Sequence, residues 1–226
     1  MKPIRKVQVA DRTEELILAN KRLKNTNLVT VKILAETIEA KDPYTRGHCN
    51  RVRVLASRIA RCAGLSRDTI EILECGALLH DIGKIGIPEN LLNKIGMLED
   101  GEISNFQLHT VIGENILKTA NFFRPCLRII RSHHEWFNGA GYPDGIRGNG
   151  IDLTARIVSI SDAFDAMTST RPYRTAMPVE VALAELRKGR EVQFDPSLVD
   201  VFIEHGLYAS FGAVSDDSGR HMKKAV

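Results

Sequence analysis

The stretch His80-Asp81-Ile82-Gly83-Lys84 decides how the rest of the chain is interpreted. It ends an apolar helical pattern, because Leu73, Ala77 and His80 recur at steps of three and four residues and so share one buried face. Gly83 then breaks the helix. A carboxylate and an imidazole buried side by side are costly unless something compensates for them, and a metal ion is the obvious compensation. The stretch therefore predicts a metal centre at the mouth of a helix.

Histidines and carboxylates elsewhere in the chain extend this pattern. Five of the seven histidines fall on inward-facing or loop-mouth positions of four successive helical segments. Each has an ordinary explanation as a core histidine or a helix end, but imidazoles and carboxylates together suit iron, manganese, cobalt, nickel or zinc. Two octahedral ions sharing Asp81 could hold a hydroxide and polarise a phosphoryl oxygen, which favours phosphoester hydrolysis. The candidate ligands are His48, His80, Asp81, His109, His133, His134 and Asp162.

Basic residues follow the candidate ligands closely. Lys84 comes one turn after the His-Asp pair, and Arg171 and Arg174 follow Asp162 in the short segment Arg171-Pro172-Tyr173-Arg174. Guanidinium groups bind phosphate oxygens through two hydrogen bonds, so these residues suit an anionic substrate. A pair of surface arginines on a loop is the alternative.

Composition limits the classes of function. The chain has 226 residues, and its formal net charge of +3 is too small to indicate binding of a nucleic-acid duplex. No apolar run reaches the roughly 18 residues that a membrane span needs, and residues 1–12 lack the apolar core of a secretory signal. The four cysteines form no CxxC pair and give no disulfide framework. We therefore expect a cytoplasmic protein without direct membrane insertion.

Helical periodicity runs along the chain, and no stretch alternates like a convincing strand. The pattern predicts an all-α fold with an N-terminal linker or signalling helix over 1–27, one domain over 28–206 and a loose tail over 207–226. The first helix is expected from residue 12, with Thr13 as its N-cap. Further helices are expected over 48–64, 66–80, 99–118, 125–133, 157–167, 177–187 and 197–204, with a glycine-rich loop over 138–150. In the first of these, Val52, Leu55 and Ile59 are expected on the buried face, and Ser66 is the expected N-cap of the second.

The first helix allows two interpretations. Leu16 and Leu23 lie a heptad apart with Asn20 between them, a spacing that can pair helices in a coiled coil. The helix would then form a homodimer or join a partner. The alternative is that its second half, with Val31 and Ile38, simply packs on the domain.

Several blocks of the sequence together resemble one known family. They are residues 39–48, His80 to Pro88, His133-His134-Glu135, the loop 139–145 with Gly141-Tyr142-Pro143, and Gln193-Phe194-Asp195-Pro196. In this order they are similar to the HD-GYP family of bacterial cyclic di-GMP phosphodiesterases, a branch of the HD metallophosphohydrolases. The resemblance runs from about Leu28 to Gly206. It implies an HD-type helical bundle with additional C-terminal helices and a long N-terminal helix.

The resemblance also implies a role for individual residues. The implied reaction opens cyclic di-GMP to linear pGpG, and often continues to GMP, by attack of a metal-bound hydroxide. Two divalent ions are expected, iron or manganese first, with other first-row metals open. His48, His80, Asp81 and Asp162 would hold one ion, and Asp81, His109, His133 and His134 the second. Lys84 would contact the scissile phosphate, Asp165, Arg171 and Arg174 would line the ligand site, and Gly141-Tyr142-Pro143 would shape its lip or dock a diguanylate cyclase domain.

The sequence departs from the family pattern near the expected lip. Asn138 stands where the family usually has Asp, Trp136-Phe137 replaces a basic-aromatic pair, and Asp152 stands where Pro is common. The first two bear on substrate fit or partner docking rather than on the metal ligands. Tyr44, one helical turn before His48, argues against a third ion, and Glu39 and Asp42 are the remaining, poorly placed candidates for its ligand.

Two alternatives to this function stay open. The same chemistry could act on another cyclic dinucleotide, such as 3′,3′-cGAMP, or the chain could sense the nucleotide or dock a partner without turnover. The first helix also resembles linkers that join such domains to sensor modules. We therefore expect either a free-standing enzyme or the output part of a larger protein.

Overall fold

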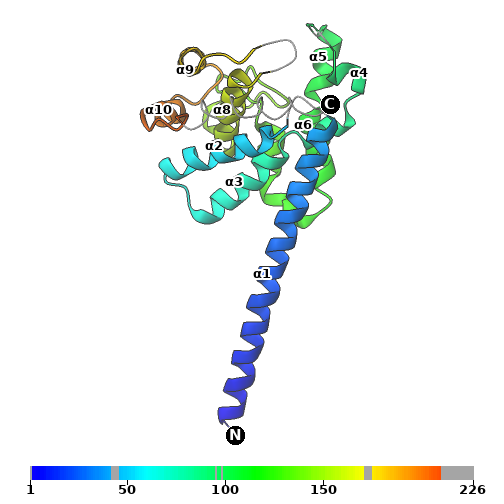
Figure 1. Cartoon of the computed structure of the whole chain (residues 1–226), viewed down its shortest axis with the longest axis vertical. Helices are drawn as coiled ribbons and strands as arrows, with labels where there is room; N and C mark the ends of the chain where they lie inside the picture. Colours follow the sequence, from blue (N-terminus) through cyan, green and yellow to red (C-terminus); the bar gives the residue numbers. More distant parts are fainter. Residues whose placement is uncertain (1, 42–45, 95, 98, 171–174, 210–226) are drawn as a thin grey trace, which may run out of the picture.

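Helices build the part of the chain that the computed structural model describes, residues 2–41, 46–94, 96–97, 99–170 and 175–209 (Figure 1). No strand occurs within these residues, so the predicted all-α fold is confirmed. None of the described helices combines the length and the hydropathy needed to cross a membrane. The α-helices are α1 (Lys2–Lys41), α2 (His48–Cys62), α3 (Arg67–Leu79), α4 (Glu89–Leu92), α5 (Asp100–Gln107), α6 (His109–Leu117), α7 (Leu127–Ser132), α8 (Leu153–Thr168), α9 (Val179–Lys188) and α10 (Pro196–Glu204). Three short 3-10 helices join them: η2 (Ile82–Gly86), η3 (Asn121–Cys126) and η4 (Gly148–Gly150).

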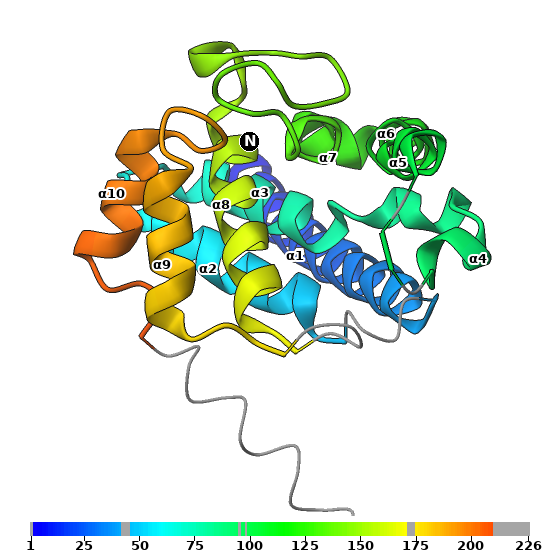
Figure 2. The same ribbon diagram turned by 90° about the horizontal axis from the view of Figure 1, so that it is seen from above.

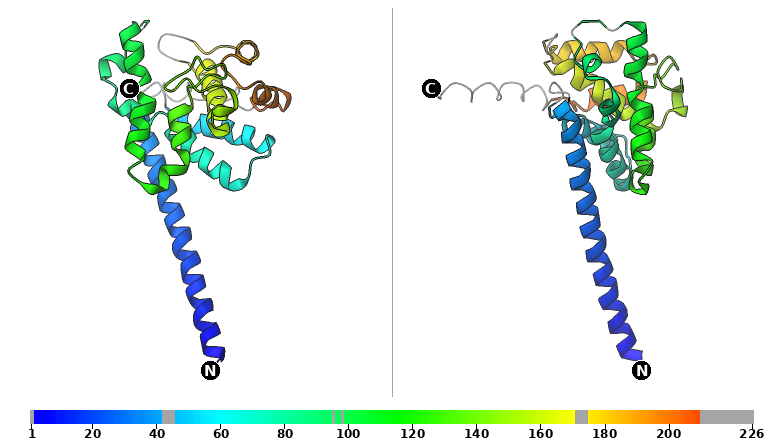
Figure 3. Two further views of the ribbon diagram at one scale, coloured as in Figure 1. Left: turned by 180° about the vertical axis from the view of Figure 1, so that it is seen from behind. Right: turned by 90° about the vertical axis from the view of Figure 1, so that its right-hand side faces the viewer.

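The first helix is longer than the sequence pattern indicated. It begins at Lys2, so Thr13 lies inside the helix and is not its N-cap. Nothing interrupts the helix before Thr13, since residues 2–12 contain no glycine and their one proline, Pro3, lies in the first turn, where proline is tolerated. The first part of α1 projects away from the other helices, as the views in Figures 1 and 3 agree.

The second half of α1 belongs to the packed body. Val31, Ala35 and Ile38 are buried and join the main hydrophobic core. This part of α1 packs against α3 and η2. The helix therefore reaches from a free-standing segment into the region that follows His80.

Helices α2, α3 and α8 form the centre of the body. Val52, Leu55 and Ile59 are buried on α2, as their spacing predicted, and α2 packs against both α3 and α8. Ser66 caps α3 by accepting a hydrogen bond from the amide of Thr69 at 3.2 Å, which confirms the predicted N-cap. Seen from above, α9 and α10 lie on the opposite side of α8 from α5 and α6 (Figure 2).

The helix expected over residues 99–118 is divided at Leu108 into α5 and α6. Near the break, side chains take over backbone acceptors: His109 Nδ1 donates to the carbonyl of Phe106 at 2.8 Å, and Thr110 Oγ1 donates to that of Gln107 at 3.1 Å. Such local side-chain bonds compete with the helical ladder. The break makes His109 the first residue of a new helix.

Candidate metal centre

The seven candidate ligands come from the ends of four helices and the middle of a fifth. His48 opens α2, His80 is the C-cap of α3, His109 opens α6, and His133 is the C-cap of α7 with His134 after it. Asp81 follows His80, and Asp162 lies within α8. The helices pack so that all seven side chains converge.

The ligand atoms form two groups that share no residue, and a third group, His80, Asp81 and His133, overlaps both. In the first, Asp162 Oδ1 lies 3.2 Å from His48 Nε2 and 3.9 Å from His80 Nε2. In the second, His109 Nε2 lies 3.4 Å from His133 Nε2, and His134 completes the trio. Within each group, the ligand atoms lie within 4.8 Å of one another.

Asp81 lies between the two groups. Its Oδ2 is 3.5 Å from His80 Nε2, and its Oδ1 is 3.6 Å from His109 Nε2. The approach depends on Gly83, because a Cβ there would lie 1.8 Å from the carbonyl oxygen of His109. The glycine in the His-Asp motif thus lets η2 lie directly against α6, which brings Asp81 to His109.

The outer nitrogen of four histidines is held by the protein. Nδ1 of His80 donates to the Ala77 carbonyl at 2.8 Å, and Nδ1 of His109 donates to the Phe106 carbonyl at 2.8 Å. Nδ1 of His133 donates to the Ile130 carbonyl at 2.9 Å, and Nδ1 of His48 donates to Asp165 Oδ2 at 2.7 Å. The bonds to carbonyls fix the tautomer of His80, His109 and His133 that points the Nε2 lone pair inward, and the bond to Asp165 orients His48 in the same way. The Nε2 atom of His80 is buried and has no hydrogen-bond partner within the described chain. A buried, orphaned nitrogen of this kind suits a metal ligand.

The charges of the centre agree with this assignment. Burial would raise the pKa of Asp81, but Lys84 and His80 outweigh it and hold that pKa well below its usual range. Burial lowers the pKa of His134 to about 3, so its imidazole is neutral at physiological pH. Burial also opposes the charged form of His48, yet its hydrogen bonds to Asp162 and Asp165 raise its pKa to about 9. Metal binding would displace that proton. The buried imidazoles and carboxylates are therefore a suitable donor set for divalent ions.

The resemblance implied that Asp165 lines the ligand site. In the structure it lies behind His48 and not on the ligand side of the centre. Only 2% of its surface is exposed, and it accepts from His48 Nδ1 on the side away from Asp162. Its other oxygen accepts from Arg51 Nε at 2.6 Å. Asp165 thus orients His48, and Arg51 in turn holds Asp165. Arg51 was not among the predicted residues, although its position one turn after His48 places both on one face of α2.

Lys84 is buried beside Asp81. Its Nζ lies 2.6 Å from Asp81 Oδ2 and 5.8 Å from the centre of the Phe106 ring. The ammonium is therefore held next to the carboxylate that lies between the two groups. Arg171 and Arg174, the other predicted phosphate ligands, lie outside the described residues.

The Gly-Tyr-Pro motif lies directly against the second group of histidines. The Tyr142 ring stacks on His134 with centroids 4.9 Å apart, and its amide donates to the His134 carbonyl at 3.1 Å. A Cβ at Gly141 would lie 2.2 Å from the amide nitrogen of Trp136, so only glycine allows this approach. The Tyr142-Pro143 peptide bond is cis. The loop therefore forms one wall of the centre.

Glu135 anchors the glycine-rich loop and was not assigned a role from the sequence. It is buried and accepts from the amides of Asp144 at 2.7 Å and Ile146 at 3.0 Å. Two departures from the family pattern also have local roles. Asn138 Oδ1 accepts from the Ala140 amide at 2.9 Å, and Asp152 caps α8 by accepting from the Thr154 amide at 2.9 Å.

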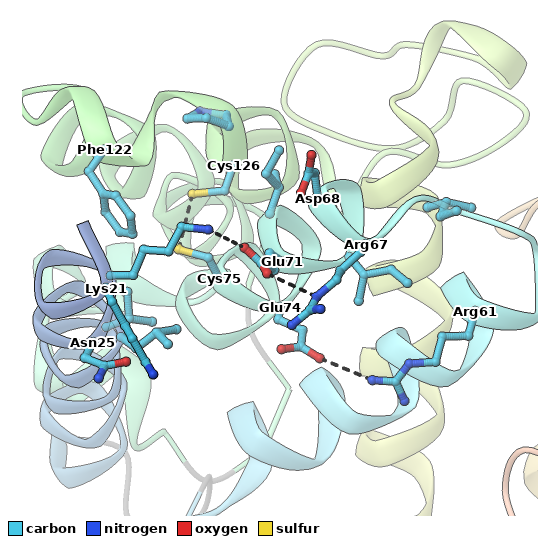
Figure 4. Close-up of a pocket in the computed structure, with 17 residues that line it drawn as sticks. Lys21, Asn25, Arg61, Arg67, Asp68, Glu71, Glu74, Cys75, Phe122 and Cys126 are labelled. Atoms are coloured by element: carbon cyan, nitrogen blue, oxygen red, sulfur yellow. Dashed lines mark hydrogen bonds and ion pairs between the residues drawn. The ribbon is translucent and has the colours of Figure 1, made fainter. Parts of the chain in front are cut away.

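A separate groove lies between α1, α3 and η3 (Figure 4). Lys21, Glu71 and Phe122 are among its lining residues, and Cys75 and Cys126 place their Sγ atoms 3.8 Å apart in it. Among the residues that the structure describes, no predicted site residue lines the groove. It is therefore distinct from the histidine centre.

Comparisons with known proteins agree with the fold and the motifs. A family model described as "HD domain" matches residues 32–198. The 3′3′-cGAMP-specific phosphodiesterase 3 of Vibrio cholerae is 40% identical over 166 residues, 74% of this chain and 36% of that protein. The cyclic di-GMP phosphodiesterase response regulator RpfG of Xanthomonas campestris is 37% identical over 192 residues, 84% of this chain and 51% of that protein. The chain thus spans about a third of the length of the first relative and about half of the second.

Two solved structures share the fold. The cyclic GMP-AMP phosphodiesterase V-cGAP3 of V. cholerae superposes with a TM-score of 0.62 over 86% of this chain and 52% of its own, at 22% identity. Bd1817, described as an HD-GYP protein from Bdellovibrio bacteriovorus, has a TM-score of 0.59 over 70% of this chain and 51% of its own, at 24% identity. At this identity the likeness concerns the arrangement of helices alone.

Proposed function

Because the chain belongs to the HD domain family, and its motifs are those of the HD-GYP branch, we propose that it is a metal-dependent phosphodiesterase that hydrolyses cyclic di-GMP to linear pGpG. The further product, where the linear dinucleotide is also accepted, is GMP. One observation carries the proposal: two buried groups of histidine and aspartate ligands have Asp81 between them and Lys84 beside it. Relatives named as phosphodiesterases of cyclic dinucleotides support the substrate class.

We assign the ligands to two divalent ions, iron or manganese. His48, His80 and Asp162 would hold one ion, His109, His133 and His134 would hold the other, and Asp81 would be a ligand of both. When bound, such ions make water acidic enough to attack phosphorus and draw charge from a phosphoryl oxygen, so no serine or cysteine nucleophile is required.

The chain's own residues complete the site. Lys84, held by Asp81, offsets the negative charge that grows on the scissile phosphate. Tyr142 stacks on His134 and limits the space on that side of the centre. Arg171 and Arg174 bind the phosphate oxygens of the dinucleotide, which their planar donors suit.

We also propose the classes of partner that the chain binds. The exposed part of α1 pairs with a second copy of the chain or continues a sensor module, and the Gly141-Tyr142-Pro143 loop offers a surface to a diguanylate cyclase domain. We place no nucleic-acid duplex and no membrane insertion in its function.

Metal content and turnover on a single anaerobic preparation test the proposal. Elemental analysis is followed by incubation with cyclic di-GMP or with 3′,3′-cGAMP, and the products are separated. About two equivalents of iron or manganese and a linear product from cyclic di-GMP are expected. Metal without hydrolysis of either dinucleotide would favour a sensing or docking module. A folded protein that retains no added metal would overturn the metal centre itself.

A further inference from the structure

The last turn of α1 contacts the start of α2 through Glu39. Its carboxylate accepts from the amide of Gly47 at 2.7 Å and from that of Cys49 at 3.0 Å. Gly47 is the N-cap of α2 and has no side chain to satisfy these donors. Glu39 therefore caps α2 from another helix. The residue between the two bound amides is His48.

The same turn contacts η2 through Lys41. Its ammonium donates to the carbonyls of Lys84 at 3.2 Å, Ile85 at 2.7 Å and Ile87 at 2.8 Å. A lysine ammonium has three donors, and here three carbonyls at the end of a 3-10 helix receive them. Cations are also favoured at this end of a helix. Lys41 thus fixes the turn that follows Asp81 and carries Lys84.

Glu39 and Lys41 are two residues apart on one rigid helix, yet they hold two separate segments of the centre. One segment carries His48, and the other carries Asp81 and Lys84. Their separation is therefore set by the end of α1. We propose that Glu39 and Lys41 are positioning residues that clamp the start of α2 and η2 at a fixed separation. Through them the projecting helix α1 is coupled to the metal centre. The catalytic part of this inference rests on the proposed function.

The clamp makes different demands of its two residues. Loss of the Lys41 ammonium releases the end of η2, so Lys84 loses its fixed placement, while Asp81, which precedes η2, and the metal-binding histidines stay. Loss of the Glu39 carboxylate releases the start of α2, so His48 and the affinity of its ion are affected first. Residues that orient the groups around a metal typically change affinity or activity by about 10–100-fold when they are replaced.

The test compares Lys41→Met and Glu39→Gln with Lys32→Met and Glu36→Gln, whose side chains are exposed on the same helix. On each protein we measure amide hydrogen exchange in residues 82–87 and 47–52. Mn²⁺ affinity is measured by titration, and kcat and KM are measured with cyclic di-GMP. We expect Lys41→Met to speed exchange in 82–87 and to lower kcat about 10–100-fold, with KM and Mn²⁺ affinity little changed. We expect Glu39→Gln to speed exchange in 47–52 and to weaken Mn²⁺ binding about tenfold. Both control variants should behave as the wild type.

A double variant tests whether Lys41 acts through Lys84. If it does, adding Lys41→Met to Lys84→Met lowers kcat by less than about twofold, because residues that act as a unit are not additive. Equal effects of Lys41→Met and Lys32→Met on exchange and on kcat would overturn the clamp. A wild type that binds Mn²⁺ but hydrolyses nothing would overturn the proposed function instead. The clamp would then stand or fall on the exchange and affinity measurements.

Discussion

At the scale of single residues, the centre depends on which oxygen of Asp81 faces which histidine. One oxygen lies near His80 and the other near His109, so a single side chain joins the two ligand groups. The same carboxylate holds Lys84 through the contact at Oδ2. Asp81 is therefore the residue at which ligation and substrate charge meet.

Replacing Asp81 tests this arrangement. Asp81→Ala should lower turnover of cyclic di-GMP at least about a hundredfold, because the link between the two groups and the partner of Lys84 are lost together. Product separation over a long incubation measures the residual rate. Asp200→Ala is the matched control, since that carboxylate pairs with Arg190 at the surface. Turnover of Asp81→Ala near the control level would contradict the shared-ligand scheme.

Asp165 gives a second prediction at this scale. Its buried carboxylate receives His48 and Arg51, so Asp165→Ala leaves an imidazole and a guanidinium without their partner. We expect the free energy of unfolding to fall by about 3 kcal/mol, as when one member of a buried pair is removed. Mn²⁺ affinity should fall about 10–100-fold because His48 is no longer oriented. Urea unfolding and metal titration measure the two effects. A lower free energy of unfolding with unchanged Mn²⁺ affinity would make Asp165 a purely structural residue.

At the scale of elements, the approach of η2 to α6 is the closest packing that the centre requires. Gly83→Ala should destabilise the protein by about 1–3 kcal/mol and reduce metal binding, because the new Cβ forces η2 away from His109. Gly101→Ala in α5 is the control, since no atom lies within 4 Å of the added Cβ. There alanine should be neutral or stabilising by up to about 1 kcal/mol. Thermal unfolding of both variants measures the difference, and equal stabilities would show that η2 can move freely.

The elements also show how far the sequence predicts this molecule. The stripe of Val52, Leu55 and Ile59 gave the buried face of α2 because helical period alone fixes that face. The seven candidate ligands were found because polar residues on apolar stripes are conspicuous. Period could not separate Asp162 from Asp165, because residues three apart share a face of α8. Only packing decides that one faces His48 Nε2 and the other its Nδ1.

The sequence could not predict contacts between distant segments, for a related reason. The sequence indicated Glu39 only as a poorly placed candidate ligand for a third ion, and it indicated no role for Lys41. Their roles depend on amides and carbonyls that belong to other elements, and backbone groups leave no mark in the sequence. The same holds for Glu135, whose acceptors are matched to amides in the glycine-rich loop.

At the scale of the whole molecule, one part of α1 packs in the body and the other part projects from it. In its second half one face is buried at Val31, Ala35 and Ile38, and its end bonds the backbone of the segments that carry His48 and Lys84. Its first half projects from the body (Figure 3). On this half, Leu16 is 70% exposed and Leu23 is 61% exposed. A helix with exposed leucines a heptad apart can bury them against a copy of itself. Pairing there would act on the rigid helix that ends at Glu39 and Lys41.

Sedimentation of the full chain tests the pairing. We expect a dimer at micromolar concentration, and a monomer when Leu16→Glu and Leu23→Glu are combined, because four glutamates would then face one another across the seam. Lys21→Glu changes the net charge by the same amount but lies about 140° around the helix from Leu16, at 100° per residue, so it should leave the dimer intact. The body should stay folded in both variants, since its buried part of α1 begins at Val31. A monomeric wild type, or a dimeric double variant, would leave the projecting helix to a sensor module or another partner.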